Sequence, residues 1–189
     1  MPLARLSIDT PLGAYALVAG PEGVTHFQDA GSAVLPPASG SADARAQRAL
    51  EAARDLFEAY FAGACDALDV LTVRPAGTPF ELRVWRALRD IPTGETASYA
   101  EIARRVGSPR AARAVGAANH RNPIAVAIPC HRVIGADGRL IGYAGGLERK
   151  RWLLDREAAW AREAHRGSAA RPPGARPAPA TGARVPSWR

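Results

Sequence analysis

Two helix-start signals constrain the fold of this 189-residue chain more than any other feature of its sequence. Thr78 is followed by a proline and then by Glu81, and Ser98 is followed by Glu101 at the same spacing. In such a capping box, the hydroxyl and the glutamate side chain each satisfy a backbone N–H group that the first helical turn leaves unpaired. Apolar residues recur at helical spacing after the first box, at Phe80, Val84, Leu88 and Ile91. The sequence therefore predicts helices that begin at Thr78 and Ser98.

A third predicted helix follows the second one closely. The pattern that begins at Ser98 stops at Gly107, and Ser108 and Pro109 provide a cap for a helix over residues 110–119. Two short helices joined by a glycine-containing turn form a helix-turn-helix. The same arrangement also occurs as a plain structural corner, so the pattern alone leaves DNA binding and a structural role equally open.

The third predicted helix combines arginines with small side chains. Arg110 and Arg113 stand among small residues that would let the backbone approach a DNA groove closely, namely Ala112, Ala114, Gly116 and Ala117. An arginine there could contact phosphates, read bases or take the place of a displaced base, and Arg113 is the candidate for the last role. The alternative is a helix packed tightly against its neighbour through its alanines.

The first 76 residues predict a small α/β (α+β) domain. Alternating residues bounded by turn signals predict a meander of three strands, over residues 3–8, 14–18 and 24–27. Apolar residues at helical spacing then predict a helix over residues 43–61, and a further strand is predicted over residues 69–73. We therefore expect an N-terminal domain over residues 1–76.

Composition divides the rest of the chain into two segments. Residues 77–165 predict a mostly helical, winged-helix-like domain built on the helix-turn-helix, with a last helix over 147–165. Residues 166–189 are rich in Pro, Ala and Arg, so we expect a disordered basic tail. Of the net charge of +7, the first domain contributes five basic and nine acidic residues, the second fifteen and nine, and the tail five arginines. A basic second domain suggests a polyanionic partner, although an arginine-rich proteome would produce the same bias.

Several protein classes are excluded by what the sequence lacks. No run of about eighteen apolar residues is present, and the start lacks the apolar segment of a secretory signal, so we expect a cytoplasmic protein without membrane association. Cys65 and Cys130 are the two cysteines, too few for a disulfide framework or a four-cysteine zinc site. The first domain offers only His26 and Cys65 as zinc ligands of the nitrogen and sulfur type, so no metal is expected.

The string with most chemical content surrounds Cys130. An apolar run over residues 122–134 delivers Cys130 next to His131. A thiol with a pKa of about 8.5 needs a base or a nearby positive charge to react at neutral pH, and His131 could supply either. Neighbouring side chains of an extended strand point to opposite faces, so a bent backbone or a bridging water would be needed between the two. Glu157 is a possible partner that orients the histidine. A buried structural cysteine beside a packed histidine is the alternative.

From Gly77 to Glu157 the chain closely resembles the O6-alkylguanine-DNA alkyltransferases, which are methylated-DNA–protein-cysteine methyltransferases. The stretches that carry the resemblance occur in order: Gly77-Thr78-Pro79-Phe80, Val84-Trp85, Ser98-Tyr99, Arg113-Ala114-Val115-Gly116, Asn122-Pro123, Ile128-Pro129-Cys130-His131-Arg132-Val133-Ile134-Gly135, Gly142-Tyr143-Ala144-Gly145-Gly146-Leu147 and Lys150-Arg151-Trp152-Leu153-Leu154. The first domain resembles the family more loosely, through Thr10-Pro11-Leu12-Gly13, and the tail lies outside the resemblance.

The resemblance implies a direct-reversal repair reaction and a role for each matching residue. Cys130 would accept the alkyl group from O6-alkylguanine, or from O4-alkylthymine, with His131 as its base through a water. Glu157 would orient His131, Tyr99 would donate to the flipped base, and Asn122 would hold the active-site turn. The product is a stable thioether, so the resemblance implies a single turnover, and no cofactor is needed because the damaged DNA supplies the alkyl group.

The resemblance also implies how the DNA is held. The second helix of the helix-turn-helix would enter the minor groove of double-stranded DNA, and Arg113 would fill the gap left by the flipped nucleotide. The remaining residues of the implied base pocket are Val133, Tyr143, Ala144 and Lys150. We expect a monomer. His120 departs from the family pattern, in which a small residue is usual.

Two other functions are compatible with parts of the sequence. A damage sensor or transcription factor could use the helix-turn-helix without chemistry. A cysteine hydrolase could be built on Cys130, His131 and Glu157, and it would turn over many substrate molecules.

Overall fold

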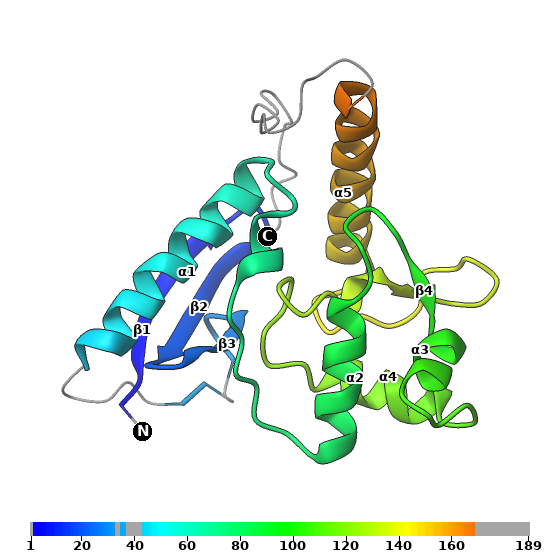
Figure 1. Cartoon of the computed structure of the whole chain (residues 1–189), viewed down its shortest axis with the longest axis horizontal. Helices are drawn as coiled ribbons and strands as arrows, with labels where there is room; N and C mark the ends of the chain where they lie inside the picture. Colours follow the sequence, from blue (N-terminus) through cyan, green and yellow to red (C-terminus); the bar gives the residue numbers. More distant parts are fainter. Residues whose placement is uncertain (1, 33–34, 37–42, 169–189) are drawn as a thin grey trace.

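Figure 1 shows the computed structural model, which describes residues 2–32, 35–36 and 43–168. A small sheet covered by one long helix lies beside a group of shorter helices, and a second long helix extends beyond both. The helices are α1 (Ala44–Ala62), α2 (Pro79–Arg89), α3 (Tyr99–Arg105), α4 (Ala112–His120) and α5 (Leu147–Ser168). The predicted mixed α/β class is confirmed for the described residues, and residues 169–189 of the predicted disordered tail lie outside them.

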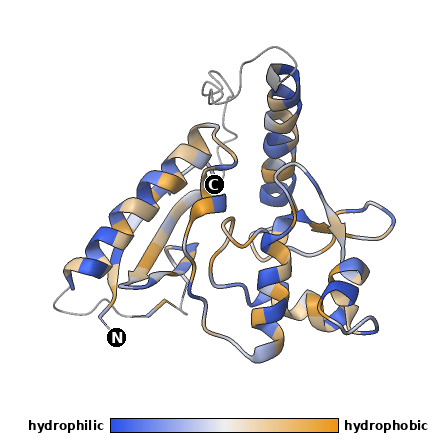
Figure 2. Cartoon of the chain, viewed as in Figure 1, coloured by the Kyte–Doolittle hydropathy of each residue, from blue (hydrophilic) through white to orange (hydrophobic). Residues whose placement is uncertain are grey.

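The N-terminal sheet is an antiparallel meander. Its strands are β1 (Ala4–Thr10), β2 (Gly13–Gly20) and β3 (Gly23–Asp29), paired in the order β1-β2-β3, which confirms the predicted topology. Helix α1 packs on this sheet, begins at the capping residue Asp43 and ends at Gly63. In Figure 2, β2 is mainly apolar whereas α1 carries both polar and apolar patches, as expected for a helix that buries one face.

The predicted strand over residues 69–73 is wrong for most of its length. A short 3-10 helix, η1 (Ala67–Val70), occupies the position instead. Its first two residues are buried while Val70 is 77% exposed, so the side chains do not alternate as those of a strand would. Val73 does contact the sheet, through an isolated parallel bridge to Val24. The apolar residues of this stretch therefore do not have the periodicity of a strand.

Both predicted capping boxes are present. The Thr78 hydroxyl accepts from the Glu81 backbone N–H at 3.3 Å, and Glu81 Oε2 accepts from the Thr78 N–H at 2.8 Å. The Ser98 hydroxyl likewise accepts from Glu101 N–H at 3.2 Å, and the Glu101 carboxylate accepts from Ser98 N–H at 2.6 Å. The predicted starts of α2 and α3 are therefore confirmed.

Two helix boundaries differ from the prediction. Helix α4 begins at Ala112 rather than at residue 110, because residues 108–111 form a turn closed by a hydrogen bond from Ala111 N–H to Ser108 O at 2.8 Å. Ser108 is therefore not the capping residue. Ala111 occupies the N-cap position, and no side chain caps the first turn of α4. Helix α5 continues to Ser168, so residues 166–168 are helical rather than part of a disordered tail.

Strand contacts fix the segment that contains Cys130 from two sides. On one side, β3 pairs with it: Phe27 N–H donates to Pro123 O at 2.9 Å, and Ala125 N–H donates to Phe27 O at 2.9 Å. On the other side, β5 (Val133–Ile134) pairs in parallel with β4 (Ala97–Ser98), directly before α3. Phe27 also stacks on Phe57 of α1, so the N-terminal sheet, its helix and the Cys130 segment share one core.

None of the described helices is long and apolar enough to cross a membrane.

A substitution at Gly23 tests the close contact between the sheet and the chain after η1. Gly23 has φ +136°, and a Cβ atom there would lie 2.5 Å from Thr72 O. We expect Gly23→Ala to lower the free energy of unfolding by about 2 kcal/mol or more, because backbone strain adds to the clash. Gly138→Ala is the matched control, since Gly138 has φ +79° with nothing within 4 Å. Urea unfolding of both variants measures the difference, and equal losses would contradict the role of the Thr72 contact.

Candidate active site

Cys130 opens a 3-10 turn, η2 (Cys130–Arg132), rather than lying on the extended strand considered in the sequence analysis. The turn follows the apolar run and buries its three side chains. The imidazole ring of His131 makes no direct hydrogen bond to Cys130, because its Nε2 pairs with Glu157 and its Nδ1 is buried without a partner among the described residues. A buried nitrogen acceptor beside the thiol is a site where a bridging water would restore the missing hydrogen bond.

Asn122 holds the turn that presents Cys130. Its Nδ2 donates to Ile128 O at 2.8 Å and to Cys130 Sγ at 3.2 Å, and its Oδ1 accepts from Ile124 N–H at 3.0 Å. Val126, in the middle of this turn, has φ +68°, a conformation that is unfavourable for a β-branched residue. The side chain of Asn122 therefore closes a strained loop and places the thiol at its end.

Behind the thiol, His131 donates through Nε2 to Glu157 Oε1 at 2.9 Å. Arg132 donates through Nε to Glu157 Oε2 at 2.7 Å and through Nη2 to Oε1 at 2.9 Å, and Tyr60 donates its hydroxyl to Oε1 at 2.7 Å. Burial alone would raise the pKa of Glu157, but His131 and Arg132 outweigh it and hold the pKa well below its usual range. The glutamate is therefore a buried carboxylate that fixes the tautomer of His131 with a hydrogen on Nε2 and leaves Nδ1 free to accept a proton.

The thiol of Cys130 needs help to ionise. Burial raises its pKa, while the hydrogen bond from Asn122 and the charge of Lys150 lower it by less. Lys150 is fully buried and donates to Val133 O at 2.6 Å and to Ile141 O at 2.8 Å. Because the thiolate is the reactive form, a base must take the thiol proton before Cys130 can react.

A cavity of about 600 Å³ lies in front of Cys130. Its walls bring together Tyr99 of α3, the exposed face of α4, Cys130 and the loop before α5, and the lining residues are Tyr99, Ala112, Arg113, Gly116, Asn119, His120, Cys130, Ile141, Gly142, Tyr143 and Ala144. The Tyr99 hydroxyl donates to Ile141 O at 3.1 Å and so lies on the wall of this cavity. A nucleophile, a phenolic donor and an arginine therefore surround one hollow.

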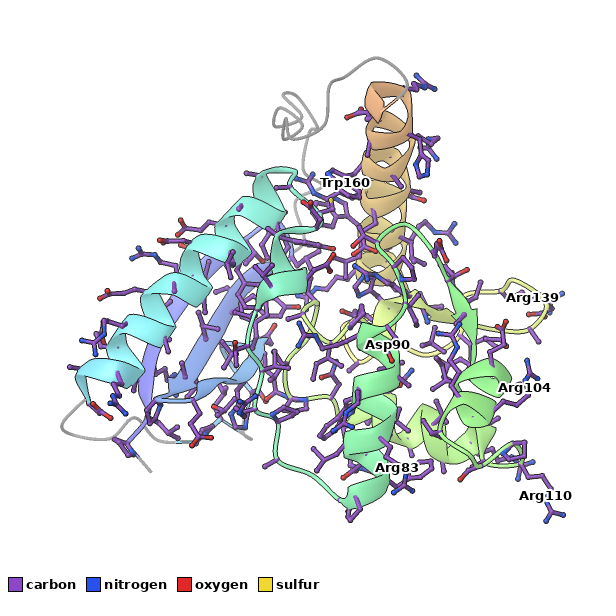
Figure 3. The ribbon with its side chains drawn as sticks, in the orientation of Figure 1. Arg83, Asp90, Arg104, Arg110, Arg139 and Trp160 are labelled. Atoms are coloured by element: carbon purple, nitrogen blue, oxygen red, sulfur yellow. The ribbon has the colours of Figure 1, made fainter. Side chains whose placement is uncertain are left out.

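Not every residue assigned to the site from the sequence reaches this cavity. Val133 and Lys150 lie behind its wall, where the Val133 carbonyl accepts from Lys150. Ala114 and Ala117 of α4 are also absent from the lining, and Arg110 is exposed in the turn before α4. In Figure 3, Arg110 projects outward from the same edge of the molecule as Arg104 and Arg139.

A second cavity, of about 640 Å³, lies on the other side of the Cys130 loop. Tyr60 and Arg132 line it, but neither Cys130 nor His131 does, so the chemistry belongs to the smaller cavity. Tyr60 and Arg132, which contact Glu157, were not assigned to the site from the sequence, and neither were Asn119, Ile141 and Gly142 of the cavity wall. Arg132 could have been found from its place beside Cys130 and His131, whereas Tyr60 lies 97 residues from Glu157 and carries no local signal.

Comparison with known proteins decides the family. The methylated-DNA–protein-cysteine methyltransferase of Methanosarcina barkeri is 49% identical over 152 residues, which cover 79% of this chain and 94% of that protein. The chain belongs to the methylated-DNA–protein-cysteine methyltransferase family. The protein of that name from Mycolicibacterium paratuberculosis is 46% identical over 149 residues, covering 78% of this chain and 88% of the relative. Residues 79–159 match the family model described as the DNA-binding domain of 6-O-methylguanine DNA methyltransferase.

The methyltransferase fold extends to solved structures. The OGT protein of Mycobacterium tuberculosis, solved in complex with DNA, superposes with a TM-score of 0.71 at 43% identity, covering 82% of this chain and 92% of that one. The family model spans Tyr99, α4, Cys130 and Glu157, so the cavity and the groups behind the thiol lie within the shared domain. Tyr60 lies outside it, in the N-terminal segment.

The buried carboxylate should govern stability at low pH. Because the pKa of Glu157 is lowered in the folded state, its contribution is present in full above the unfolded value of about 4.3 and is lost as pH falls towards the folded value. We expect Glu157→Gln to cost about 3 kcal/mol at pH 7, because Arg132 is left buried without its partner charge. The variant should also lose less stability than the wild type between about pH 5 and about pH 3, an interval that brackets the unfolded pKa.

Urea unfolding across this pH range measures both effects. Glu163→Gln, on an exposed position of the same helix, is the control and should follow the wild-type curve. An acid limb that is equally steep with and without the Glu157 carboxylate would contradict this account.

Proposed function

We propose that this methyltransferase repairs DNA by moving the alkyl group of O6-alkylguanine to Sγ of Cys130. The observation that carries the proposal is the thiol at the wall of a cavity of about 600 Å³, with His131 and Glu157 behind it and α4 at its mouth. Guanine O6 is buried in paired DNA, so the nucleotide must leave the stack to reach a cavity of this kind. The homologous relatives carry the same activity in their names.

The transfer is an in-line displacement at carbon. His131 Nδ1 takes the proton of the Cys130 thiol through a bridging water, because its Nε2 is already committed to Glu157. The thiolate attacks the alkyl carbon, the S–C bond forms, and the C–O6 bond breaks with its electron pair passing to the guanine. Tyr99 donates its phenolic proton to the departing base, so guanine leaves as a neutral species, and the proton taken up by His131 returns to the Tyr99 oxygen through water. Asn122 supports the reaction by holding the thiol in line.

Chain topology supports double-stranded DNA as the substrate. We assign α3, the turn at residues 106–111 and α4 as a helix-turn-helix whose second helix enters the minor groove. Helix α4 passes beside Tyr99, because a Cβ atom at Gly116 would lie 3.8 Å from that ring, at ordinary contact distance. Arg113 lines the mouth of the cavity and takes the place of the flipped nucleotide, while Arg110 contacts phosphate.

The product limits the protein to one turnover. We propose that the protein acts as a monomer and needs no cofactor. S-alkylcysteine is a thioether with no easy leaving group, so Cys130 is consumed. O4-alkylthymine presents an alkyl–oxygen bond of the same type on a smaller base, and it is the alternative substrate for the same assay. A hydrolase built on the same residues would instead release product and turn over repeatedly.

Mass spectrometry of the peptide that carries Cys130 measures the transfer. Incubation with a duplex that contains O6-methylguanine should add one methyl group to the peptide that carries Cys130 and leave Cys65 unmodified. Burial raises the pKa of Cys65 to about 12, so that thiol is not a competing acceptor. Cys65→Ser is the control and should accept a full equivalent, whereas Cys130→Ser should bind the duplex and accept none. Repeated turnover, or methylation of the Cys130→Ser protein, would contradict the mechanism.

Substitution of Arg113 should slow the transfer step, whereas substitution of Arg110 should weaken duplex binding. Arg113→Ala should slow transfer from duplex DNA at least about tenfold at saturating DNA, yet leave transfer from a single strand nearly unchanged, because only the duplex needs base extrusion. Arg110→Ala is the matched control: it should lower duplex affinity and reduce the salt slope of binding by about one, without slowing transfer at saturation. Single-turnover kinetics with both substrates test this, and equal losses on duplex and single strand would remove the assignment of Arg113.

A further inference from the structure

The N-terminal segment reaches the groups behind the thiol through one side chain, Tyr60. Tyr60 lies in the last turn of α1, is fully buried, and donates its hydroxyl to Glu157 Oε1 at 2.7 Å. The same oxygen accepts from His131 Nε2 at 2.9 Å and from Arg132 Nη2 at 2.9 Å. Three donors from two elements, α1 and η2, therefore share one carboxylate oxygen.

The Tyr60 hydroxyl keeps its proton and acts as a hydrogen-bond donor to Glu157. Burial raises its pKa well above the usual value, and the neighbouring charge of Glu157 raises it further. Glu157 stays ionised, and an ionised carboxylate only accepts hydrogen bonds. The direction of the bond from Tyr60 to Glu157 is thus fixed by the chemistry of its two ends.

Each donor forms a weaker hydrogen bond when it shares its acceptor oxygen with other donors. A hydrogen bond to a charged group is stronger than one between neutral groups, and donors on one oxygen compete for the same negative charge. The Tyr60 hydroxyl therefore weakens the pull of Glu157 on the Nε2 hydrogen of His131. It also fixes the rotation of the carboxylate, so that Oε1 faces the imidazole.

We propose that Tyr60 is a positioning residue of the alkyl transfer, whose hydroxyl sets how strongly Glu157 holds His131 and thereby the pH range in which Cys130 is activated. This rests on the proposed function. It assigns the N-terminal segment a part in the chemistry, although none of its residues lines the cavity in front of Cys130.

The other ionisable groups around this cluster are fixed by the same packing. They come from the segment after α1, from η1 and from the loop before α5, and they are Cys65, Asp69 and Tyr143. Arg132 alone contacts both oxygens of Glu157. Removal of the Tyr60 hydroxyl therefore leaves the carboxylate charge paired and changes its strength as an acceptor for His131.

The test compares the pH dependence of transfer in Tyr60→Phe with that of the wild type. Without the hydroxyl, Glu157 holds the imidazole proton more strongly, so the midpoint of the acid limb should move upward by about half a pH unit, or about threefold in rate on that limb. Site-specific replacement of Tyr60 by 3-fluorotyrosine keeps the shape and gives a more acidic hydroxyl, so its midpoint should move downward. Opposite shifts support the proposal.

Phe57→Leu is the matched control for a structural effect. Phe57 lies one turn earlier on α1, is fully buried and stacks on Phe27, so the variant loosens the same core without touching Glu157. It should lower the melting temperature and leave the midpoint unchanged. A midpoint that Tyr60→Phe does not move, moves downward, or moves only as far as Phe57→Leu does would overturn the role of Tyr60.

A second readout does not need DNA. The Nε2 hydrogen of His131 should give a proton resonance that moves downfield in Tyr60→Phe and upfield with 3-fluorotyrosine, because its hydrogen bond to Glu157 strengthens or weakens accordingly. If the wild type transfers no alkyl group, the proposed function fails and this resonance still tests Tyr60. If the wild type transfers normally and the resonance stays in place in both variants, only the Tyr60 proposal is lost.

Discussion

The buried carboxylate of Glu157 is the interaction on which the rest of this structure depends. A charge removed from water is tolerated only when donors surround it, and here the donors come from Tyr60, His131 and Arg132. Those residues lie on α1 and η2, so satisfying one carboxylate also joins the N-terminal segment to the DNA-binding domain. The same hydrogen bonds that stabilise the fold orient the imidazole of His131.

The sheet supports the thiol by a different physical means. Its third strand makes two backbone hydrogen bonds to the chain between Asn122 and Val126, and those bonds hold one end of a strained loop. Asn122 closes the other end with its side chain. A loop held at both ends by backbone and amide hydrogen bonds can keep Cys130 at a constant position, which a displacement reaction at carbon requires.

Burial of the Cys130 thiol disfavours its ionisation. It raises the pKa of Cys130, so the free protein does not hold a thiolate ready to react with stray electrophiles. In the proposed mechanism, proton removal depends on His131, whose Nδ1 is itself buried. Under that proposal a thiol that stays protonated until the substrate binds suits an acceptor that is consumed by one reaction.

The sequence by itself determined the local elements and the reacting group. Capping boxes at Thr78 and Ser98 specify helix starts through contacts three residues apart, and the string around Cys130 identified the family because its order is fixed. Local patterns failed where burial decided the outcome, as in η1, whose residues pack without strand alternation. Only the tertiary structure could bring Tyr60 to Glu157, because a hydrogen bond between residues so distant in the chain depends on how α1 and α5 pack, and no local spacing records that packing.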